Sequence, residues 1–264
     1  INASNLVAAQ NVWMDPAIVD QFSKVAKELK RIAPKANDFL YFTATIITAA
    51  EAAILNRDGS LKKDATGRDL NCNWEKKGRS WKWVCSDSAV KPYKNNNGDI
   101  FPEEELIKAH KKWVGRPLCL DHKSTSVDMV RGIIVDTYYD YVNKKVIALC
   151  ALDKVNYPDL ARKVSSGYST SVSMGTAVAE AICTDCGTVA MAEPDFCDCM
   201  RHRRCYGEIN VGLSPIELSI VVTGADPDAK IRQVLASAHQ IGEQIERYST
   251  MKRTALDETA DIES

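Results

Sequence analysis

The sequence predicts an α+β protein with a core of mainly antiparallel strands, closed as a barrel or packed as a sandwich. Three observations indicate this class. Strand-like segments outnumber helical ones, and they do not alternate with helices as in βαβ units. The chain has no internal repeat. Its 264 residues, 45% of them apolar, are enough to bury a full core without disulfide staples.

The N-terminal region predicts a helix followed by a strand. The helix covers about residues 15–31, because Asp15 can cap it, Pro16 suits its first position and apolar residues recur at helical spacing. Residues 39–50 predict a strand, because aromatic and β-branched side chains dominate them.

A polar insert over residues 57–93 predicts a hairpin with a basic tip. Trp74, Trp81 and Trp83 flank the tip. These aromatic and basic residues either contact nucleic acid or a protein partner, or form a solvated hairpin with one packed face. Cys72 and Cys85 flank the hairpin. A cross-strand disulfide would fit there, but we expect free thiols in a cytoplasmic product.

The rest of the chain predicts helices and strands in a mixed order. Glutamates in the first turn favour a helix over about 102–113. Strands are expected at 131–140, 145–153, 169–176 and 216–223, a short helix at 157–164, and a terminal helix at about 228–248 before a polar tail. The expected organisation is an N-terminal arm and helix (1–37), a core domain (38–228) with inserts at 57–93 and 180–208, and a C-terminal helix and tail (229–264).

Charge and hydropathy exclude two broad classes of function. Lys and Arg total 34 and Asp and Glu total 35, so a net charge of −1 argues against a general nucleic-acid coat. No apolar run approaches the roughly 20 residues of a membrane helix, so no membrane partner is expected. The chain begins at Ile1, so we expect either a trimmed product or numbering that starts inside a longer one.

Five of the nine cysteines cluster between residues 183 and 205 and predict a metal site. A Cys-x2-Cys pair followed by Gly187 is typical of a zinc knuckle, and a second Cys/His group about ten residues on completes a tetrahedron around Zn²⁺. Such a closed site is structural; reduced thiols or a disulfide knot are the other interpretation. The favoured ligands are Cys183, Cys186, Cys199 and His202, with Cys197 as the main alternative and Cys205 as the third. Cys119 and Cys150 lie in apolar runs and are expected in the core.

His122 and Ser173 form the other chemical candidate. A serine hydroxyl needs a base such as histidine within hydrogen-bond reach, and the base needs an orienting group. Gly175 permits a tight backbone and could expose amides to an oxyanion. By themselves these residues are a weak signal, because most serines on strands and most histidines are not catalytic.

From residue 94 onward the chain resembles the prohead (capsid maturation) protease family of tailed phages, which is related in fold to herpesvirus assemblins. The resemblance covers about residues 38–55 and 94–232. The matching stretches follow the family's order: Asn95 to Pro102 before a helix, Gly115 to His122, Arg131 to Ile134, Ser166 to Ser169, Val172 to Gly175, Glu217 to Val221 and Ala225 to Ala229.

The resemblance implies an antiparallel, assemblin-like β-barrel core and a serine endopeptidase. Carried over by position, His122 is the general base, Ser173 the nucleophile and Glu217 the third member; Ser171 is the fallback nucleophile, and Ser169 shares its face. The implied substrates are capsid and scaffold proteins inside a prohead that assembles in the host cytoplasm, and we expect a homo-oligomer. The protein partner of the tryptophan hairpin would then be a capsid protein. The alternative is a catalytically silent, zinc-stabilised structural or scaffolding protein of the capsid. A zinc-knuckle nucleic-acid binder is a third interpretation, which the net charge disfavours.

The C-terminal tail predicts self-processing. Leu256-Asp257-Glu258 resembles the Leu/Ile-x-Glu cleavage signal of some members of the family, and the tail has no apolar periodicity. We expect a product ending at Glu258 in the active protein and not in Ser173→Ala, measured as intact mass. A solvated acidic tail is the other interpretation, and both proteins would then still end at Ser264 after head assembly.

Overall fold

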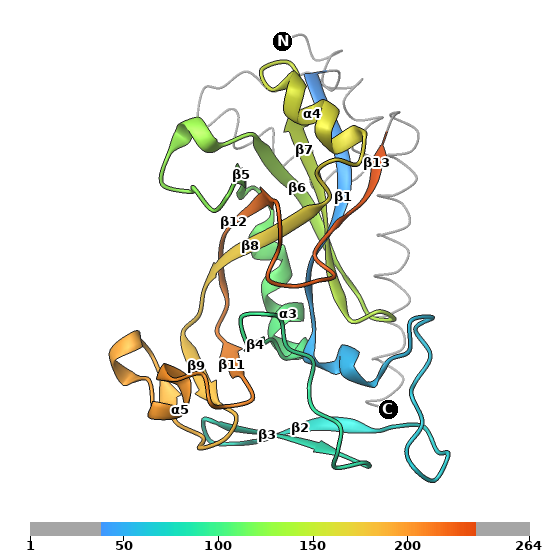
Figure 1. Ribbon diagram of the computed structural model, residues 1–264, viewed down its shortest axis with the longest axis vertical. Coiled ribbons are helices and arrows are strands. Elements are labelled where there is room, and N and C mark those ends of the chain that lie inside the picture. Colours follow the sequence, from blue (N-terminus) through green and yellow to red (C-terminus); the bar gives the residue numbers. More distant parts are fainter. Residues whose placement is uncertain (1–37, 236–264) are drawn as a thin grey trace, which may run out of the picture.

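The computed structural model describes residues 38–235 and is dominated by a curled seven-stranded sheet (Figure 1). Neighbouring strands are antiparallel except β5 and β12, which run parallel. Across the sheet the order is β13 (Ile231–Leu235), β1 (Phe39–Thr48), β7 (Lys145–Asp153), β6 (Gly132–Asp140), β5 (Pro117–Leu120), β12 (Ser214–Val221) and β8 (Ser171–Ala177).

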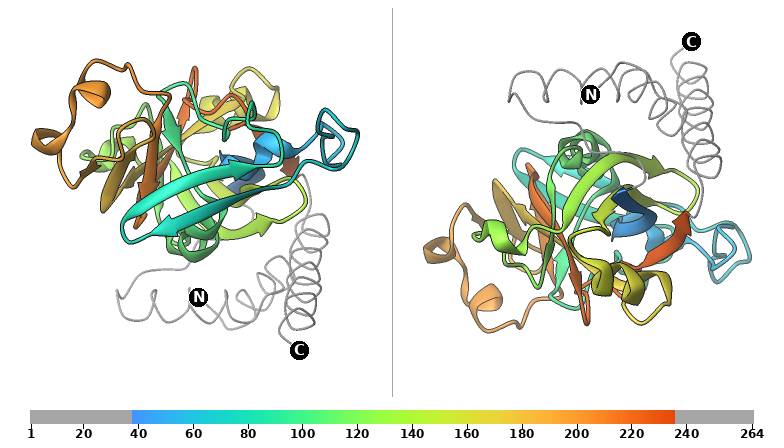
Figure 2. Two further views of the ribbon diagram at one scale, coloured as in Figure 1. Left: turned by 90° about the horizontal axis from the view of Figure 1, so that it is seen from below. Right: turned by 90° about the horizontal axis from the view of Figure 1, so that it is seen from above.

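The curl brings the two edges of this sheet towards each other. On the edge strand β8, the backbone N–H of Val172 donates to the carbonyl of Ala229, at 3.0 Å. The N–H of Ile231, the first residue of the other edge strand, donates to the carbonyl of Thr170 at 2.8 Å. The structure is therefore an α+β half-barrel (Figure 2), and the expected antiparallel barrel is not confirmed.

The main core lies inside the curl and is closed by helix α3 (Glu103–Ala109) and the 3₁₀ turn η3 (His110–Trp113). Burial of this apolar surface is the main force that keeps the sheet curled. Cys119 and Cys150 are buried, as expected. The largest buried side chains of this core include Phe42, Ile46, Leu106, Trp113, Leu118 and Ile134.

A smaller sheet continues from strands β8 and β12. It has the order β10 (Val189–Ala190), β9 (Glu180–Cys183), β11 (Glu208–Val211) and β4 (Asp99–Ile100). Figure 1 shows β8 running on into β9 and β11 running on into β12, so two chain segments join the sheets. The N–H of Ala179 donates to the carbonyl of Val211 at 3.0 Å and so pairs these segments between the sheets.

The tryptophan-rich insert forms the expected hairpin, with β2 (Cys72–Lys77) paired to β3 (Ser80–Cys85). Trp81 is buried and packs in one cluster with residues of the small sheet, with Trp74 at its margin, so the hairpin has a packed face. The expectation of free thiols is wrong in this structure, which has a Cys72–Cys85 disulfide. The physical reason is the register, which places the two residues opposite each other with their Cα atoms 4.0 Å apart.

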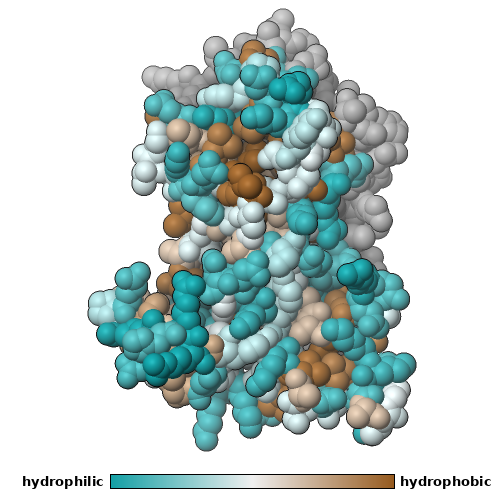
Figure 3. Space-filling model, in the orientation of Figure 1, coloured by the Kyte–Doolittle hydropathy of each residue, from teal (hydrophilic) through white to brown (hydrophobic). Residues whose placement is uncertain are grey.

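The remaining helices of the described residues are short. They are η2 (Ala50–Ile54), η4 (Val127–Met129), α4 (Pro158–Ser165), η5 (Glu193–Asp195) and α5 (Asp198–Arg201). No helix within residues 38–235 is long and apolar enough to cross a membrane. The face in Figure 3 is largely hydrophilic, with an apolar area near α4. Leu160 of α4 and Ile220 and Val222 of the β12 end line a groove in this region.

Most of the expected helices and strands inside the described range are present. The helix expected over about 228–248 is wrong in its first residues. Residues 231–235, expected in a helix beginning near Asp228, form strand β13 and pair with β1. The core sheet thus extends past residue 228, because β1 offers an open edge whose hydrogen bonds a strand can satisfy. The expected helix at 15–31, the remainder of the C-terminal helix and the tail lie outside the described residues.

Candidate functional site

Strand pairing brings two serines, a glycine and a glutamate together at the β8–β12 ladder. Ser173 of β8 lies opposite Ser219 of β12, and Gly175 lies opposite Glu217. Residues two apart on a strand point to the same face, so the four residues form a compact patch. Glu217 and Ser219 are buried, and Ser173 is 8% exposed.

His122 follows strand β5, which runs parallel to β12. The N–H of Asp121 donates to the carbonyl of Ile220 at 3.2 Å, and the N–H of His122 donates to Oγ of Ser219 at 3.0 Å. Asp121 and His122 both have left-handed backbone conformations, with φ of 49° and 57°. Such conformations are costly for residues other than glycine, so these bonds to β12 hold the turn that presents the histidine.

The Glu217 carboxylate joins this network at both oxygens. Oε1 lies 2.8 Å from Nδ1 of His122, and Oε2 accepts a hydrogen bond from Oγ of Ser219 at 2.6 Å. The Glu217 side chain is 2% exposed, whereas the His122 side chain is 47% exposed. An ionised carboxylate only accepts, so in a neutral imidazole paired with it Nδ1 carries the proton and Nε2 has a lone pair for a substrate or a nucleophile.

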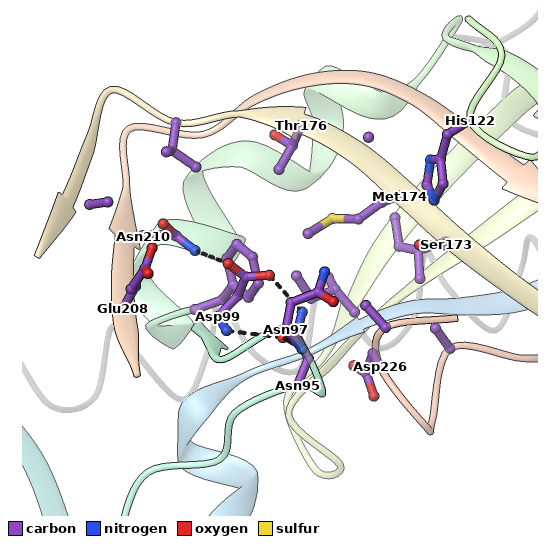
Figure 4. A pocket seen from close by; sticks show the side chains of 18 of the residues that line it. Asn95, Asn97, Asp99, His122, Ser173, Met174, Thr176, Glu208, Asn210 and Asp226 are labelled. Carbon is purple, nitrogen blue, oxygen red and sulfur yellow. Dashed lines mark hydrogen bonds between the residues drawn. The ribbon is translucent and has the colours of Figure 1, made fainter. Parts of the chain in front are cut away.

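His122 and Ser173 line one cavity of about 510 Å³ (Figure 4). Gly175 and Thr176 continue the β8 wall, whereas the other predicted nucleophiles lie elsewhere. Ser171 pairs with Val221 and bridges to Lys230, and Ser169 lines the separate groove beside α4. The structure thus brings His122, Ser173 and Glu217 together, and of the three candidate serines Ser173 is the one that shares the cavity of His122.

The end of the cavity away from His122 is acidic. Asp99 accepts hydrogen bonds from the side-chain amides of Asn95, at 2.9 Å, and Asn210, at 3.0 Å. Glu208 lies beside it in Figure 4, and partial burial together with the Asp99 carboxylate raises the pKa of Glu208. Sequence reasoning missed this end of the cavity, because its residues come from two strands far apart in the chain.

Gly175 is needed because the Glu217 side chain occupies the space beside it. The sequence suggested a different reason, the exposure of backbone amides to an oxyanion. A Cβ at this position would lie 2.5 Å from Oε1 of Glu217, the atom that contacts His122. Gly175→Ala is therefore expected to displace the carboxylate from Nδ1 of His122. For the enzyme proposed below, the expected loss of turnover is about 100-fold, since small misplacements of catalytic groups have effects of this size. Turnover is measured beside Thr176→Ala as a control on the same strand. An unchanged rate would show that the carboxylate position does not matter.

Four cysteines form a second cluster at the far end of the small sheet. Cys183 is the last residue of β9 and Cys186 lies in the turn that follows, whereas Cys197 and Cys199 come from the start of α5. The four sulfur atoms all lie within 4.8 Å of one another. The group could hold a metal ion, as the spacing predicted. The fourth member differs from the expected set, because the cluster contains Cys197 where the sequence favoured His202.

Helix α5 explains this difference. Cys197 is its N-cap residue and Cys199 lies in its first turn, so both thiols face the Cys183–Cys186 knuckle, with 3.4 Å between the sulfurs of Cys186 and Cys197. His202 is the C-cap residue at the opposite end, and its side chain is exposed. Cys205 packs at the margin of the apolar cluster beneath the site.

The two knuckle thiols have different environments. Burial raises the pKa of Cys183 to about 12. Hydrogen bonds from the hydroxyl and backbone N–H of Thr188 and from the Cys197 thiol lower the pKa of the exposed Cys186 to about 6. Cys186 therefore supplies a thiolate near neutral pH, which is the form that binds metals.

Within the described residues, the other histidines lie outside the His122 network. His110 lies near Thr137, with 3.3 Å between Nδ1 and Oγ1, and His202 caps α5; His239 lies outside the described residues. Sequence reasoning did not assign a role to Ser219. Its signal was its place two residues after Glu217 on one strand, which puts both side chains on one face.

Comparison of the chain with protein-family models, with curated proteins and with solved structures finds no match.

Proposed function

We propose that this chain is a serine endopeptidase in which Ser173 is the nucleophile, His122 the general base and Glu217 the group that orients the histidine. The observation that carries the proposal is the 2.8 Å contact between Nδ1 of His122 and the buried Glu217 carboxylate, beside a serine in the same cavity. A carboxylate, an imidazole and a hydroxyl in this order form the arrangement that activates a serine.

The chemistry follows from the roles of the three groups. Nε2 of His122 takes the proton of the Ser173 hydroxyl as Oγ attacks the substrate carbonyl, and the imidazolium then donates this proton to the leaving amine. Glu217 holds the ring through Nδ1 and stabilises the positive charge that forms on it. Water repeats the sequence on the acyl-enzyme and releases the second product. The contact between His122 and Glu217 is already formed without a substrate, so little reorganisation of these two groups is needed at the moment of reaction.

The substrates we propose are scaffold and capsid proteins of an assembling phage head. The support for them is the ordered set of sequence stretches that resemble the prohead protease family, from Asn95 to Ala229. The open, partly exposed His122 is compatible with an extended chain segment as substrate, because proteases bind the backbone as a strand.

A serine-reactive alkyl fluorophosphonate tests the assignment without knowledge of the substrate. We expect one labelled serine, Ser173, with labelling lost in Ser173→Ala and kept in Ser171→Ala. Labelling at Ser171, or no labelling of folded protein, would contradict the proposal. The second result would favour a catalytically silent, zinc-stabilised structural or scaffolding protein of the capsid.

We also propose that the four-cysteine cluster binds a structural Zn²⁺. Zinc prefers four tetrahedral ligands with Zn–S bonds of about 2.3 Å, which place sulfur atoms about 3.8 Å apart. The observed sulfur group is compact enough to close to this geometry. Four thiolates leave no open position for water, so the ion would stabilise the fold and take no part in the chemistry.

Elemental analysis is expected to find about one zinc per chain. Cys197→Ser should lower this content sharply, because an alcohol is a poor ligand for zinc, whereas His202→Ala should leave it unchanged. The reverse pattern would restore His202 as the fourth ligand. Zinc-free wild-type protein would exclude the site.

A further inference from the structure

One wall of the catalytic cavity comes from the segment between the two halves of the cysteine cluster. Residues 187–196 join Cys186 to Cys197, and five of them line the cavity that contains His122 and Ser173. They are Ala190, Met191, Ala192, Glu193 and Phe196. Both ends of this wall are therefore attached to the cysteine cluster.

Apart from the cysteines, contacts with the adjacent small sheet attach the wall: Val189 packs against the cluster that contains Trp81 and Ile182, and Phe196 packs against the cluster that contains Ala181 and Met200. Strand β10, two residues long, pairs with β9, and only Ala190 of the lining residues is buried. The other hydrogen bonds are local. Asp195 accepts from the N–H groups of Met191 and Ala192, and the Arg201 guanidinium donates to the carbonyl of Phe196.

The hydrogen-bond network of the catalytic groups belongs to another part of the fold. Glu217 and Ser219 lie on β12, and His122 follows β5, which pairs with β12 in the large sheet. The hydrogen bonds that hold these three residues join them to one another. A change in the insert can therefore move the wall without disturbing the catalytic pair.

We propose that the four-cysteine site positions one wall of the substrate cavity, so that metal occupancy sets substrate affinity and leaves the reactivity of Ser173 unaltered. The role in substrate binding rests on the endopeptidase function proposed above. A metal ion that joins Cys183 and Cys186 to Cys197 and Cys199 closes the loop at its base, and metal binding of this kind is coupled to local folding. Cys183, Cys186, Cys197 and Cys199 are positioning residues in this scheme.

The test compares the full chain as purified, the chelator-treated chain and the Cys197→Ser and Cys199→Ser variants, with Cys205→Ser as the matched control. Cys205 is a neighbouring thiol outside the four-sulfur group. Three readouts are used: hydrogen exchange over residues 189–196, labelling by a small alkyl fluorophosphonate, and kcat and KM for the decapeptide that the parent protein cleaves best in a mixed-sequence library.

We expect loss of metal to speed hydrogen exchange in residues 189–196 and to raise KM about 10- to 100-fold. Fluorophosphonate labelling and kcat should change little, because the small reagent needs only Ser173 and His122. Cys205→Ser should behave as the parent. Chelation of the intact chain supplies the same comparison where a variant does not fold.

The outcomes separate this inference from the proposed function. Unchanged exchange and KM after complete metal removal would overturn the role of the site. Joint loss of labelling and peptide cleavage would also overturn it, since the metal would then support the whole fold. A parent protein that neither labels nor cleaves would refute the endopeptidase, and metal-dependent protection of residues 189–196 would still support the positioning of the wall.

Discussion

Ser173→Ala is expected to lower kcat for the selected decapeptide by about 10⁶-fold, the loss typical of removing a nucleophile. The effect should be this large because the hydroxyl forms the covalent intermediate, and the remaining catalytic groups cannot replace it. The change removes one oxygen at a position that lines the cavity, so the melting temperature should stay close to that of the parent. His122→Ala should produce a loss of similar size, since the hydroxyl then has no base.

Ser171→Ala is the matched control for the nucleophile. Ser171 lies two residues earlier on β8, points to the same face and pairs with Val221, outside the cavity of His122. Its removal should leave kcat within a few-fold of the parent. If Ser173→Ala cleaved the decapeptide normally and Ser171→Ala did not cleave it, Ser171 would be the nucleophile.

Glu217→Gln is expected to lower kcat by about 10⁴-fold, as loss of the orienting carboxylate does in serine proteases. Glutamine keeps the volume of the buried side chain, but its amide can donate to Nδ1 and so favour the wrong tautomer of His122. It also removes the negative charge that stabilises the imidazolium. The measurement is kcat and its pH profile, with the melting temperature recorded beside it.

Glu208→Gln is the control for this carboxylate. Glu208 lines the same cavity, but the hydrogen bonds of the His122 network do not include it. Its substitution should spare kcat, whereas a rate for Glu217→Gln within a few-fold of the parent would reduce Glu217 to a structural residue. The observed partners of Glu217 are the side chains of His122 and Ser219. A buried strand carboxylate with a purely structural role would instead accept hydrogen bonds from the backbone.

The sequence by itself determined the local elements of this protein. Strands at 39–48, 132–140 and 145–153 and the tryptophan hairpin follow from β-branched and aromatic residues bounded by turn residues. The knuckle of Cys183 and Cys186 follows from a spacing of two residues, which brings two thiols together in one tight turn. These features depend on neighbours in the chain, so local patterns suffice to predict them.

The tertiary structure alone decided which distant residues meet. His122 and Glu217 are 95 positions apart, and only the parallel pairing of β5 with β12 brings the imidazole to the carboxylate. The start of α5 selects Cys197 over His202, and the β2–β3 register joins Cys72 to Cys85. Residues 231–235 became a strand because β1 offered an open edge, which overrode their local preference. Strand order and register depend on which surfaces bury each other across the whole chain, and no local pattern of side chains contains that information.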